Sequence, residues 1–364
     1  MSLQPVALAQ AASVALAPLL GSVEVSVGDR LFGSDRAVVT RAVARDADGR
    51  EHLLVLEAPT GSGDGWAREE SALRLLATHH VSGVVRLLGT SADPPLLVLA
   101  DLGNGPTLAD RLLGDDPHAA EAAVLAWAGA IGNVQASTTG LRQAFIGELT
   151  ALSPFGPPTA DTSRESVAEA AVALARDLPR LGIVASDTAL EELRAIAVDL
   201  DVSAPGAHGG LVPGDTCPSN AVETDEGLVL LDFEGAEYRH IAWEAAYLSV
   251  PWPSCWCSWS LPPEVAEQAL SVWRQTVAPV FPAVMAPSFD DDLVRATTAW
   301  AFISAGWFLG PALDGDPPPA DPARRAIVPT RRALLQHRLS GVAEQDTPFC
   351  RLCVTLPLRR TGPR

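Results

Sequence analysis

The sequence predicts an α+β fold with two lobes, a small β-rich lobe followed by a large helical lobe. Up to Ala100, most apolar residues lie in short segments that alternate with polar residues or are rich in valine, which is typical of strands. After the Gly-containing connector Asp101–Gly105, long Ala- and Leu-rich segments have the spacing of amphipathic helices. A chain of 364 residues is long enough for two or three structural units.

An apolar, Ala-rich segment, Val6–Leu20, precedes the β-rich lobe. No basic residue stands before it, so we expect a helix on this lobe, or a leader, rather than a signal peptide. An Asp-Ala-Asp-Gly turn at residues 46–49 predicts a hairpin between two strands. The expected elements of the lobe are strands at Val23–Val27, Ala37–Arg45, His52–Glu57, Val84–Leu88 and Pro95–Ala100, and a helix at Trp66–Thr78.

The second lobe is expected to be mainly helical, with a Pro-, Gly- and Asp-rich loop at Pro311–Asp321 and a loose tail at Cys350–Arg364. The expected helices are Leu108–Leu113, Glu121–Ser137, Ser166–Leu178, Thr188–Val198, Pro263–Val277, Asp290–Trp307 and Arg324–Leu339.

The charge of the chain limits its partners. The formal net charge is −18 and no lysine is present, so nucleic-acid binding, which needs basic patches, is not expected. The acidic balance suits a cationic small substrate, or serves only solubility. No uninterrupted apolar run reaches the roughly 18 residues of a membrane span. Five cysteines without a secretory signal favour reduced thiols and a cytoplasmic location.

The most informative stretch begins with the turn-rich segment Pro213–Asn220, in which Asp215 and Asn220 are five positions apart. An apolar, strand-like run, Gly227–Leu231, follows, and Asp232 comes directly after it. Three oxygen-bearing side chains on two short loops suit Mg²⁺, which takes oxygen ligands and substrate phosphates. They also suit phosphoryl transfer, which needs a group that receives a hydroxyl proton and a metal that neutralises phosphate charge.

These residues resemble the aminoglycoside phosphotransferase-like family, the small-molecule kinases of the protein kinase-like superfamily. That family carries a loop of the form His-Gly-Asp-x-x-x-x-Asn, followed after a short strand by Asp-Phe-Glu or Asp-Trp-Glu. Gly214 to Asn220 and Asp232-Phe233-Glu234 fit this order and spacing, and the resemblance covers about residues 22–340. It implies a two-lobed protein kinase-like fold, with ATP and Mg²⁺ as cofactors and the hydroxyl of a small molecule as acceptor.

The resemblance also implies boundaries: residues 1–21 a helix or leader, 22–103 the nucleotide-binding lobe, 104–345 the helical lobe with the catalytic loop, and 346–364 a tail. Asp215 would be the catalytic base, and Asn220 and Asp232 would hold Mg²⁺. Glu69, or its neighbour Glu70, would be the helix glutamate that pairs with a lysine of the sheet. We prefer Glu69, because leucine follows it four positions on. The hinge that meets adenine would be Leu99, Ala100, Asp101 and Leu102.

A second alignment of the loop is open. His208-Gly209-Gly210 also begins a loop of this form, but it places Gly210 where the aspartate belongs and Asp215 where the asparagine belongs. This alignment loses both functional groups and lengthens the spacing to Asp232, so the alignment with Asp215 and Asn220 is preferred.

Two residues depart from the family pattern. Pro213 replaces the loop histidine, which is a structural support. Glu57 ends the third strand, where the lysine that grips the phosphates is expected, and a carboxylate at that position repels phosphate. Three explanations are open: an arginine replaces the lysine, with Arg41 as the chosen candidate beside Arg36 and Arg45; a second cation bridges Glu57 to phosphate; or the protein is a pseudokinase that works as a binding partner.

The remaining features leave other functions open. The same fold serves enzymes that phosphorylate Ser or Thr of a peptide before elimination, which is a further alternative. Close thiol pairs at Cys255/Cys257 and Cys350/Cys353 could bind Zn²⁺, although free or buried thiols are the simpler interpretation. Trp252, Trp256 and Trp259 could line a substrate pocket or belong to the core. His240 and Glu244 are expected to be structural.

Overall fold

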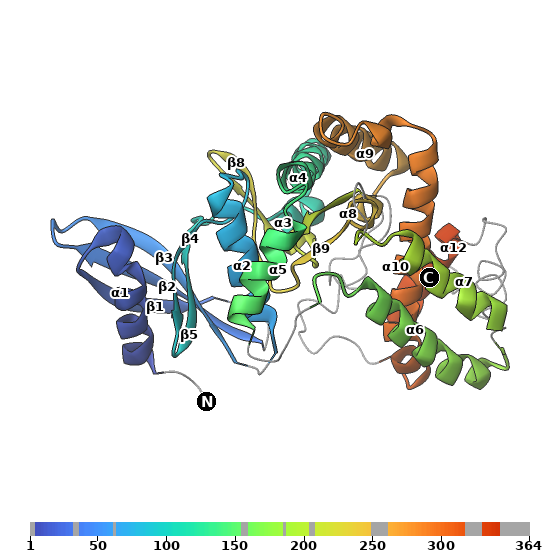
Figure 1. Ribbon diagram of the computed structural model, residues 1–364, viewed down its shortest axis with the longest axis horizontal. Helices are drawn as coiled ribbons and strands as arrows, with labels where there is room; N and C mark the ends of the chain where they lie inside the picture. The colour runs from blue at the N-terminus through green and yellow to red at the C-terminus, as the bar shows by residue number, and fades with distance from the viewer. Residues whose placement is uncertain are drawn as a thin grey trace.

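The computed structural model describes residues 4–31, 36–60, 63–153, 159–184, 187–203, 208–248, 261–316 and 330–342. The chain forms a small lobe of sheet and helix, at the left of Figure 1, and a larger helical lobe at the right. The predicted α+β class with two lobes is therefore confirmed. None of the helices in these ranges is both long and apolar enough to cross a membrane.

The small lobe contains an antiparallel sheet of five strands in the order β1-β2-β3-β5-β4. Its strands are β1 (Val23–Arg30), β2 (Ala37–Asp46), β3 (Glu51–Pro59), β4 (Leu87–Ala92) and β5 (Pro95–Ala100), and its helices are α1 (Pro5–Leu20) and α2 (Gly65–Thr78). The hairpin predicted between the second and third strands is present, with Val39 opposite Glu57 and Arg45 opposite Glu51.

Helix α1 covers the outer face of this sheet, as predicted for the apolar N-terminal segment (Figure 1). Leu8 and Leu16 of α1 pack in one buried cluster with Leu54 and Leu56 of β3. Side chains alternate between the two faces of a strand, so Glu57, between Leu56 and Ala58, lies on the opposite face, toward α2. Apolar packing on one side of β3 thereby determines which side chains point into the space between the lobes.

The larger lobe contains helices around two short antiparallel ladders, β6 with β9 and β7 with β8. The strands are β6 (Gly209–Val212), β7 (Ala221–Thr224), β8 (Gly227–Leu230) and β9 (Glu237–His240). The α-helices are α3 (Leu108–Leu113), α4 (Pro117–Ser137), α5 (Arg142–Leu152), α6 (Ser163–Asp177), α7 (Asp187–Asp199), α8 (Ala242–Tyr247), α9 (Pro263–Val277), α10 (Ser288–Leu313) and α12 (Arg331–Val342). Short 3₁₀ turns occur at η1 (Leu178–Leu181), η2 (Pro218–Asn220) and η3 (Pro282–Met285).

Fully buried aromatic side chains fill the core of the larger lobe, among them Trp127, Trp243 and Trp273. Helices α4 and α9 pack together, and the indole Nε1 of Trp273 donates to Oε1 of the buried Gln135 at 2.7 Å. The helical lobe thus has a continuous core on which the short ladders rest.

Several local predictions differ from the structure. The strand expected at Val84–Leu88 begins only at Leu87, because Val84 bridges in parallel to Leu230 of the other lobe. Helices α5 and α8 and the four-residue strands β6, β7 and β9 are not among the predicted elements. The last helix begins at Arg331 within the described range, and residues 324–329 of its predicted span lie outside the described residues, as do the tail and the tryptophans at 252, 256 and 259.

The cysteines also differ from the expectation of reduced thiols. Cys217, which lies between Asp215 and Asn220, is disulfide-bonded. The other four cysteines lie outside the described residues, so the proposed Zn²⁺ site at these positions stays a prediction.

Candidate active site

Three of the predicted site residues meet where the β6–η2 loop and the end of β8 come together. The Nδ2 amide of Asn220 donates to the backbone oxygen of Asp215 at 3.1 Å and to Oδ2 of Asp232 at 3.3 Å. The backbone nitrogen of Leu231 donates to the backbone oxygen of Asn220 at 3.0 Å. In the other alignment of the loop, Gly210 would take the place of Asp215, but Gly210 lies within β6, opposite Arg239.

Gly214 allows the loop to lie directly on the turn that follows Asp232. Its φ of +86° is in the left-handed region, and a Cβ added to it would lie 1.8 Å from the backbone oxygen of Gly235. Asp232 itself has a φ of 65°, which orients its carboxylate relative to Asn220. Close backbone contact therefore fixes the distance between the two segments that carry the predicted base and metal ligands.

We expect Gly214→Ala to destabilise the protein by more than about 2 kcal/mol, because the new methyl group meets backbone that cannot move aside. Gly140→Ala is the matched control, since Gly140 also has a positive φ, of +77°, but a Cβ added to it would have no atom within 4 Å. The control should cost only about 1 kcal/mol of backbone strain. Urea unfolding of both variants measures the difference, and equal losses would contradict the proposed close contact.

An acidic cavity of about 140 Å³ lies between the sheet, α2 and the turn after Asp232. Its charged lining residues are Glu57 from β3, Glu69 from α2, Glu234 from the turn, and Arg36 at the start of β2. Leu97 of β5, opposite Glu57 in the sheet, forms part of the apolar wall. The remaining lining residues are Ala37, Pro59, Gly63, Gly65 and Trp66.

Burial and mutual repulsion change the protonation of these carboxyl groups. Burial and the charges of Asp232 and Glu234 raise the pKa of Glu57 to about 7. Burial, with the charges of Glu234 and Asp215, raises the pKa of Asp232 to about 7 as well. The pKa of Glu69, which is 1% exposed, lies well above its ordinary value because of burial and the charge of Glu57. The site therefore favours the arrival of positive charge.

Glu69, the predicted helix glutamate, lines the cavity, and its role stays a prediction. Its carboxylate accepts a hydrogen bond from the backbone nitrogen of Phe233 at 3.2 Å and faces the cavity that contains Glu57. The alternative, Glu70, instead accepts from Nε of Arg74 at 2.8 Å within the same helix. A pair of carboxyl groups, Glu57 and Glu69, therefore stands where the family pattern has a lysine and a glutamate.

Of the three candidate arginines, Arg36 lies just before β2, and Arg41 and Arg45 lie within it. Arg36 pairs with Glu234 and lines the cavity. Arg41 lies opposite Val55, where its Nε is 3.1 Å from Oδ2 of Asp101 and its Nη2 donates to the backbone oxygen of Gly103. Arg45 pairs with Glu51 at the far end of the hairpin. The arginine at the cavity is therefore Arg36, whereas Arg41, the chosen candidate, holds the hinge.

The predicted hinge continues directly from β5. Leu99 and Ala100 are its last strand residues, opposite Val55 and Leu54. The backbone nitrogen of Asp101 donates to the oxygen of Leu53 at 3.3 Å, so the chain stays beside β3 as it leaves the sheet. The backbone nitrogen of Gly103, just beyond Leu102, donates to Oδ1 of Asp101 at 2.8 Å. The hinge is thereby held by its own side chain and by Arg41.

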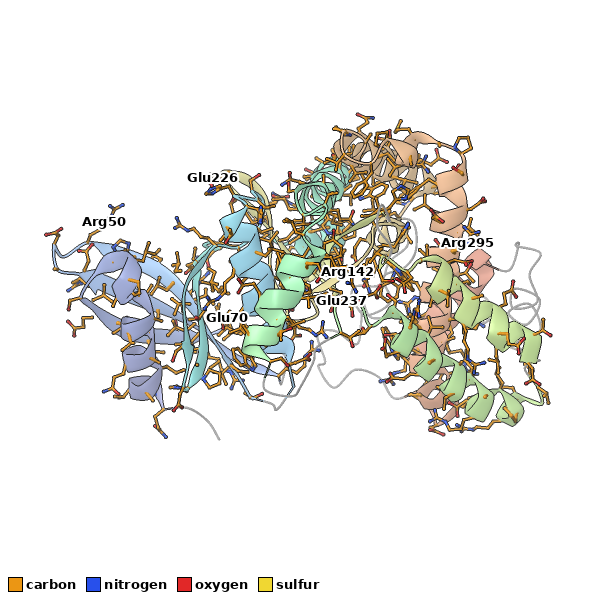
Figure 2. All side chains as sticks on the ribbon, viewed as in Figure 1. Arg50, Glu70, Arg142, Glu226, Glu237 and Arg295 are labelled. Atoms are coloured by element: carbon orange, nitrogen blue, oxygen red, sulfur yellow. The ribbon has the colours of Figure 1, made fainter. Side chains whose placement is uncertain are left out.

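A buried polar network supports the loop from the helical side. The hydroxyl of Thr216, next to Asp215, donates to the carboxylate of Glu244, which is fully buried. Arg239 donates to Glu244 through Nη2 and to Oε2 of Glu237 through Nη1, the latter at 3.1 Å; Figure 2 labels Glu237. The Arg239 guanidinium also lies over the ring of Trp300, 5.3 Å from its centroid.

Arg239 is a site residue whose role was not predicted, whereas Arg36 was considered only beside Arg41, the chosen candidate. The partners of Arg239 come from β9, α8 and α10. Their spacing along the sequence follows no pattern from which these contacts could be predicted. Glu244, expected to be structural, holds the loop through Thr216 and so has an architectural place in the site.

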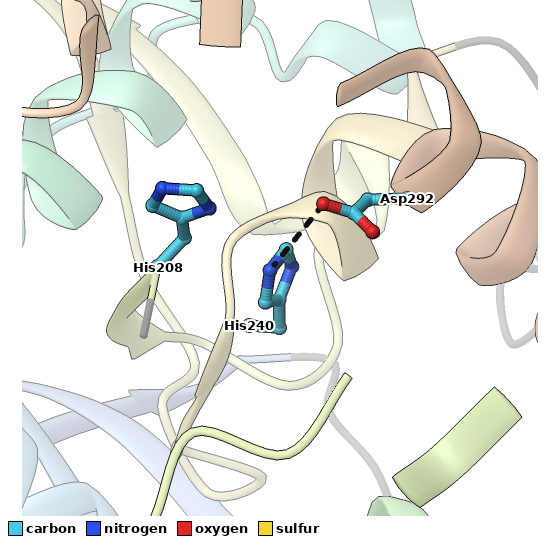
Figure 3. A group of neighbouring side chains, drawn as sticks. All are labelled: His208, His240 and Asp292. Atoms are coloured by element: carbon cyan, nitrogen blue, oxygen red, sulfur yellow. Dashed lines mark ion pairs between the residues drawn. The ribbon is translucent and has the colours of Figure 1, made fainter. Parts of the chain in front are cut away.

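A second polar group lies at the other end of the β6–β9 ladder, formed by His208, His240 and Asp292 (Figure 3). Their nitrogen and oxygen atoms lie within 4.8 Å of one another, which is a spacing that a metal could close. However, Nδ1 of His240 accepts a hydrogen bond from the backbone nitrogen of Ala242 at 3.2 Å, so the neutral ring carries its proton on Nε2. Nε2 of His240 lies 3.9 Å from Oδ2 of Asp292. The other carboxylate oxygen of Asp292, Oδ1, lies 3.0 Å from Nη1 of Arg295. The group therefore forms a structural contact between β9 and α10.

Acid is expected to weaken the fold through His240. Burial, with the charges of His208 and Arg295, lowers the pKa of His240 to about 3 from an unfolded value of 6.5. Between these values the unfolded chain binds a proton that the folded protein rejects, so stability falls as pH decreases. Through His240, the free energy of unfolding should fall by about 2–3 kcal/mol between pH 7 and pH 4.5.

The test compares urea midpoints of the wild type with those of His240→Asn, whose Oδ1 can still accept from Ala242. Glu57 and Asp232, with raised pKa values, act in the opposite direction, and the difference between the two proteins removes their contribution. The variant should lose less stability in acid than the wild type. Parallel pH curves would show that His240 does not titrate in this way.

The donor set at the loop fits a hard divalent cation. Asp232 offers a carboxylate beside the amide of Asn220, and oxygen ligands are those that Mg²⁺ prefers. Burial and the nearby charges of Glu234 and Asp215 raise the pKa of Asp232, and the same environment would make a bound cation favourable.

Comparison with known proteins shows the fold. No protein-family profile and no curated protein match the sequence. The structure is similar to that of Plasmodium vivax ethanolamine kinase, with a TM-score of 0.52 and 10% identity over 91% of this chain and 84% of that chain. It is also similar to a choline/ethanolamine kinase family protein from Mesorhizobium loti, with a TM-score of 0.51 and 15% identity over 95% of this chain and 94% of that chain. The two-lobed, kinase-like fold that the motifs predicted is confirmed.

Proposed function

We propose that the protein is an ATP- and Mg²⁺-dependent phosphotransferase whose acceptor is a hydroxyl group of a small molecule. The observation that carries this proposal is the position of Asn220, which joins the backbone of Asp215 to the carboxylate of Asp232. These hydrogen bonds support the proposal, because they hold close together the three residues that would serve as base and metal ligands. The similarity in fold to small-molecule kinases supports it.

In this proposal Asn220 and Asp232 hold Mg²⁺, which supplies charge neutralisation for the phosphates when it is bound. Asp215 orients the acceptor hydroxyl and receives its proton. Leu99 to Leu102 present backbone groups to adenine, and Arg41 fixes that segment through Asp101. Arg36, at the cavity, is the arginine placed to meet a phosphate, because guanidinium groups bind phosphate oxygens well.

The acceptor is proposed to be small and cationic. The net charge of −18 attracts cations, and both solved structures compared above are named for choline or ethanolamine kinases. We do not propose nucleic acid or a membrane as a partner. We propose that the protein is located in the cytoplasm.

Nucleotide binding tests the proposal. ATP with MgCl₂ should raise the unfolding temperature of the protein, by an amount equivalent to about 2.7 kcal/mol at a hundredfold excess over Kd, and ATP with EDTA should not. ADP release with a panel of cationic amino alcohols then tests transfer. Absence of any shift at millimolar Mg²⁺-ATP would refute the proposed function.

One observation favours a second candidate, a pseudokinase that binds a partner instead of transferring phosphate. Glu57 and Glu69 face the cavity together, and Arg36 is already paired with Glu234. The unfolding temperature of such a protein would not change when Mg²⁺-ATP is added in the same experiment.

A further inference from the structure

The turn that follows Asp232 is held at both of its ends by consecutive residues of α2. At the first end, the backbone nitrogen of Phe233 donates to Oε1 of Glu69 at 3.2 Å. At the last end, Nη1 of Arg68 donates to the backbone oxygen of Ala236 at 3.1 Å. Within the turn, the nitrogen of Ala236 donates to the oxygen of Phe233 at 2.9 Å. A helix of the small lobe thereby holds a closed turn of the larger lobe.

The guanidinium group of Arg68 joins three segments of the chain. Besides its bond to Ala236, Nη2 donates to the backbone oxygen of Thr159 at 3.0 Å, and Nε donates to Oδ2 of Asp64 at 2.9 Å. Asp64 precedes α2 in the small lobe, whereas Thr159 and Ala236 belong to the larger lobe. Arg68 is only 8% exposed, and hydrogen bonds from a charged donor are strong in such surroundings.

The same turn also lies against the loop that carries Asp215. A Cβ added to Gly214 would lie 1.8 Å from the backbone oxygen of Gly235, so the loop and the turn are in close contact. Asp232 stands at the beginning of this turn, and its carboxylate accepts from Asn220 of the loop. A displacement of the turn would therefore move Asp232 relative to Asp215 and Asn220.

We propose that Arg68 is a positioning residue, which holds α2 on this turn and so sets the place of Asp232 beside Asn220. Its effect on phosphoryl transfer rests on the proposed function. Arg68 acts through the turn and not on a substrate, and a small misplacement of a reacting group can cost up to about a hundredfold in rate. The fork of donors matters as well as the charge, because a lysine cannot reach two carbonyl groups in the same fixed geometry.

The first experiment measures amide hydrogen exchange of the protein without nucleotide. In Arg68→Met, the amides of Phe233 and Ala236 should exchange about tenfold faster than in the wild type, because the turn has lost its donor from α2. The amides of the β7–β8 ladder in the same lobe should keep their wild-type rates. Unchanged exchange at the turn, or an equal increase in the ladder, would overturn the proposal.

Two further variants make this result specific. Arg74→Met is the matched control, because Arg74 lies on the same helix but donates to Glu70 and Thr90 within the small lobe. It should leave exchange at the turn unchanged. Arg68→Lys keeps the charge and one donor group, and should accelerate exchange by only about threefold. Because α2 also packs against α5 of the larger lobe (Figure 1), we expect all three variants to fold.

The second experiment measures transfer and its Mg²⁺ requirement. In Arg68→Met, kcat should fall by about a hundredfold and half-maximal activity should need about tenfold more Mg²⁺, while KM for the acceptor stays within about threefold. Arg68→Lys should recover part of both losses. An unchanged Mg²⁺ requirement, or a rise in the acceptor KM that matches the fall in kcat, would overturn the role in positioning Asp232. If the wild type does not bind Mg²⁺-ATP, the proposed function fails, and the exchange rates still decide whether Arg68 holds the turn.

Discussion

Asp215→Asn is expected to reduce phosphoryl transfer by about a thousandfold or more, because asparagine cannot receive the proton of the acceptor hydroxyl. Nucleotide affinity should change only a few-fold, since the amide keeps the shape of the side chain and the backbone oxygen of residue 215 can still accept from Asn220. ADP release in the presence of acceptor measures the first quantity, and titration with Mg²⁺-ATP measures the second.

Asp225→Asn is the matched control, because Asp225 is exposed in the turn between β7 and β8 and its replacement removes the same charge. It should leave both quantities unchanged. Full turnover by Asp215→Asn would mean that another group receives the proton, and a loss of nucleotide binding equal to the loss of turnover would assign Asp215 to binding instead.

Arg239→Met is expected to destabilise the protein by about 3–5 kcal/mol, the cost of leaving buried carboxylates without their partner. Arg239 donates to both Glu237 and Glu244, and each of these three side chains is less than a tenth exposed. Methionine fills similar apolar space between Trp243 and Trp300 but supplies no charge. Urea unfolding measures the loss.

Arg45→Met removes an arginine from an exposed pair with Glu51 and serves as the control. Its unfolding midpoint should stay at the wild-type value, because exposed pairs contribute little. If Arg239→Met also unfolded at the wild-type midpoint, the buried carboxylates would be stabilised in another way, for example by protonation.

The predictions with the clearest local pattern agree with the structure, because the same pattern creates it. The Ala-rich segment Val6–Leu20 became α1, and Pro263–Val277 became α9 with the predicted bounds. The alternation in β3 places Glu57 on the face toward α2, as a period of two requires. Asp215, Asn220 and Asp232 lie together because the spacing of the motif matches one short hairpin, while their roles stay a prediction.

What could not be predicted depends on contacts between distant segments. Arg41 and Glu57 lie on the same face of the sheet, but the register places Arg41 opposite Val55, two residue pairs nearer to the hinge than Glu57, where Asp101 binds it. The position of Arg36 depends on where β2 begins, and helix or strand periodicity does not encode such an end. Four-residue strands such as β6 and β9 are too short to show an alternation of apolar and polar residues. The ladder that contains Arg239 could therefore not be predicted from the sequence.

The packing of α1 on the outer face of the sheet has a consequence for how this protein can diverge. Leu54, Leu56 and Ala58 hold β3 in register whatever side chain occupies position 57, because that side chain contributes nothing to the outer core. One nucleotide change in the codon of residue 57 can therefore exchange an acid for a base at the cavity while the scaffold stays intact. Under the proposed function, a change between a phosphate-repelling and a phosphate-binding charge at position 57 would need only this one substitution.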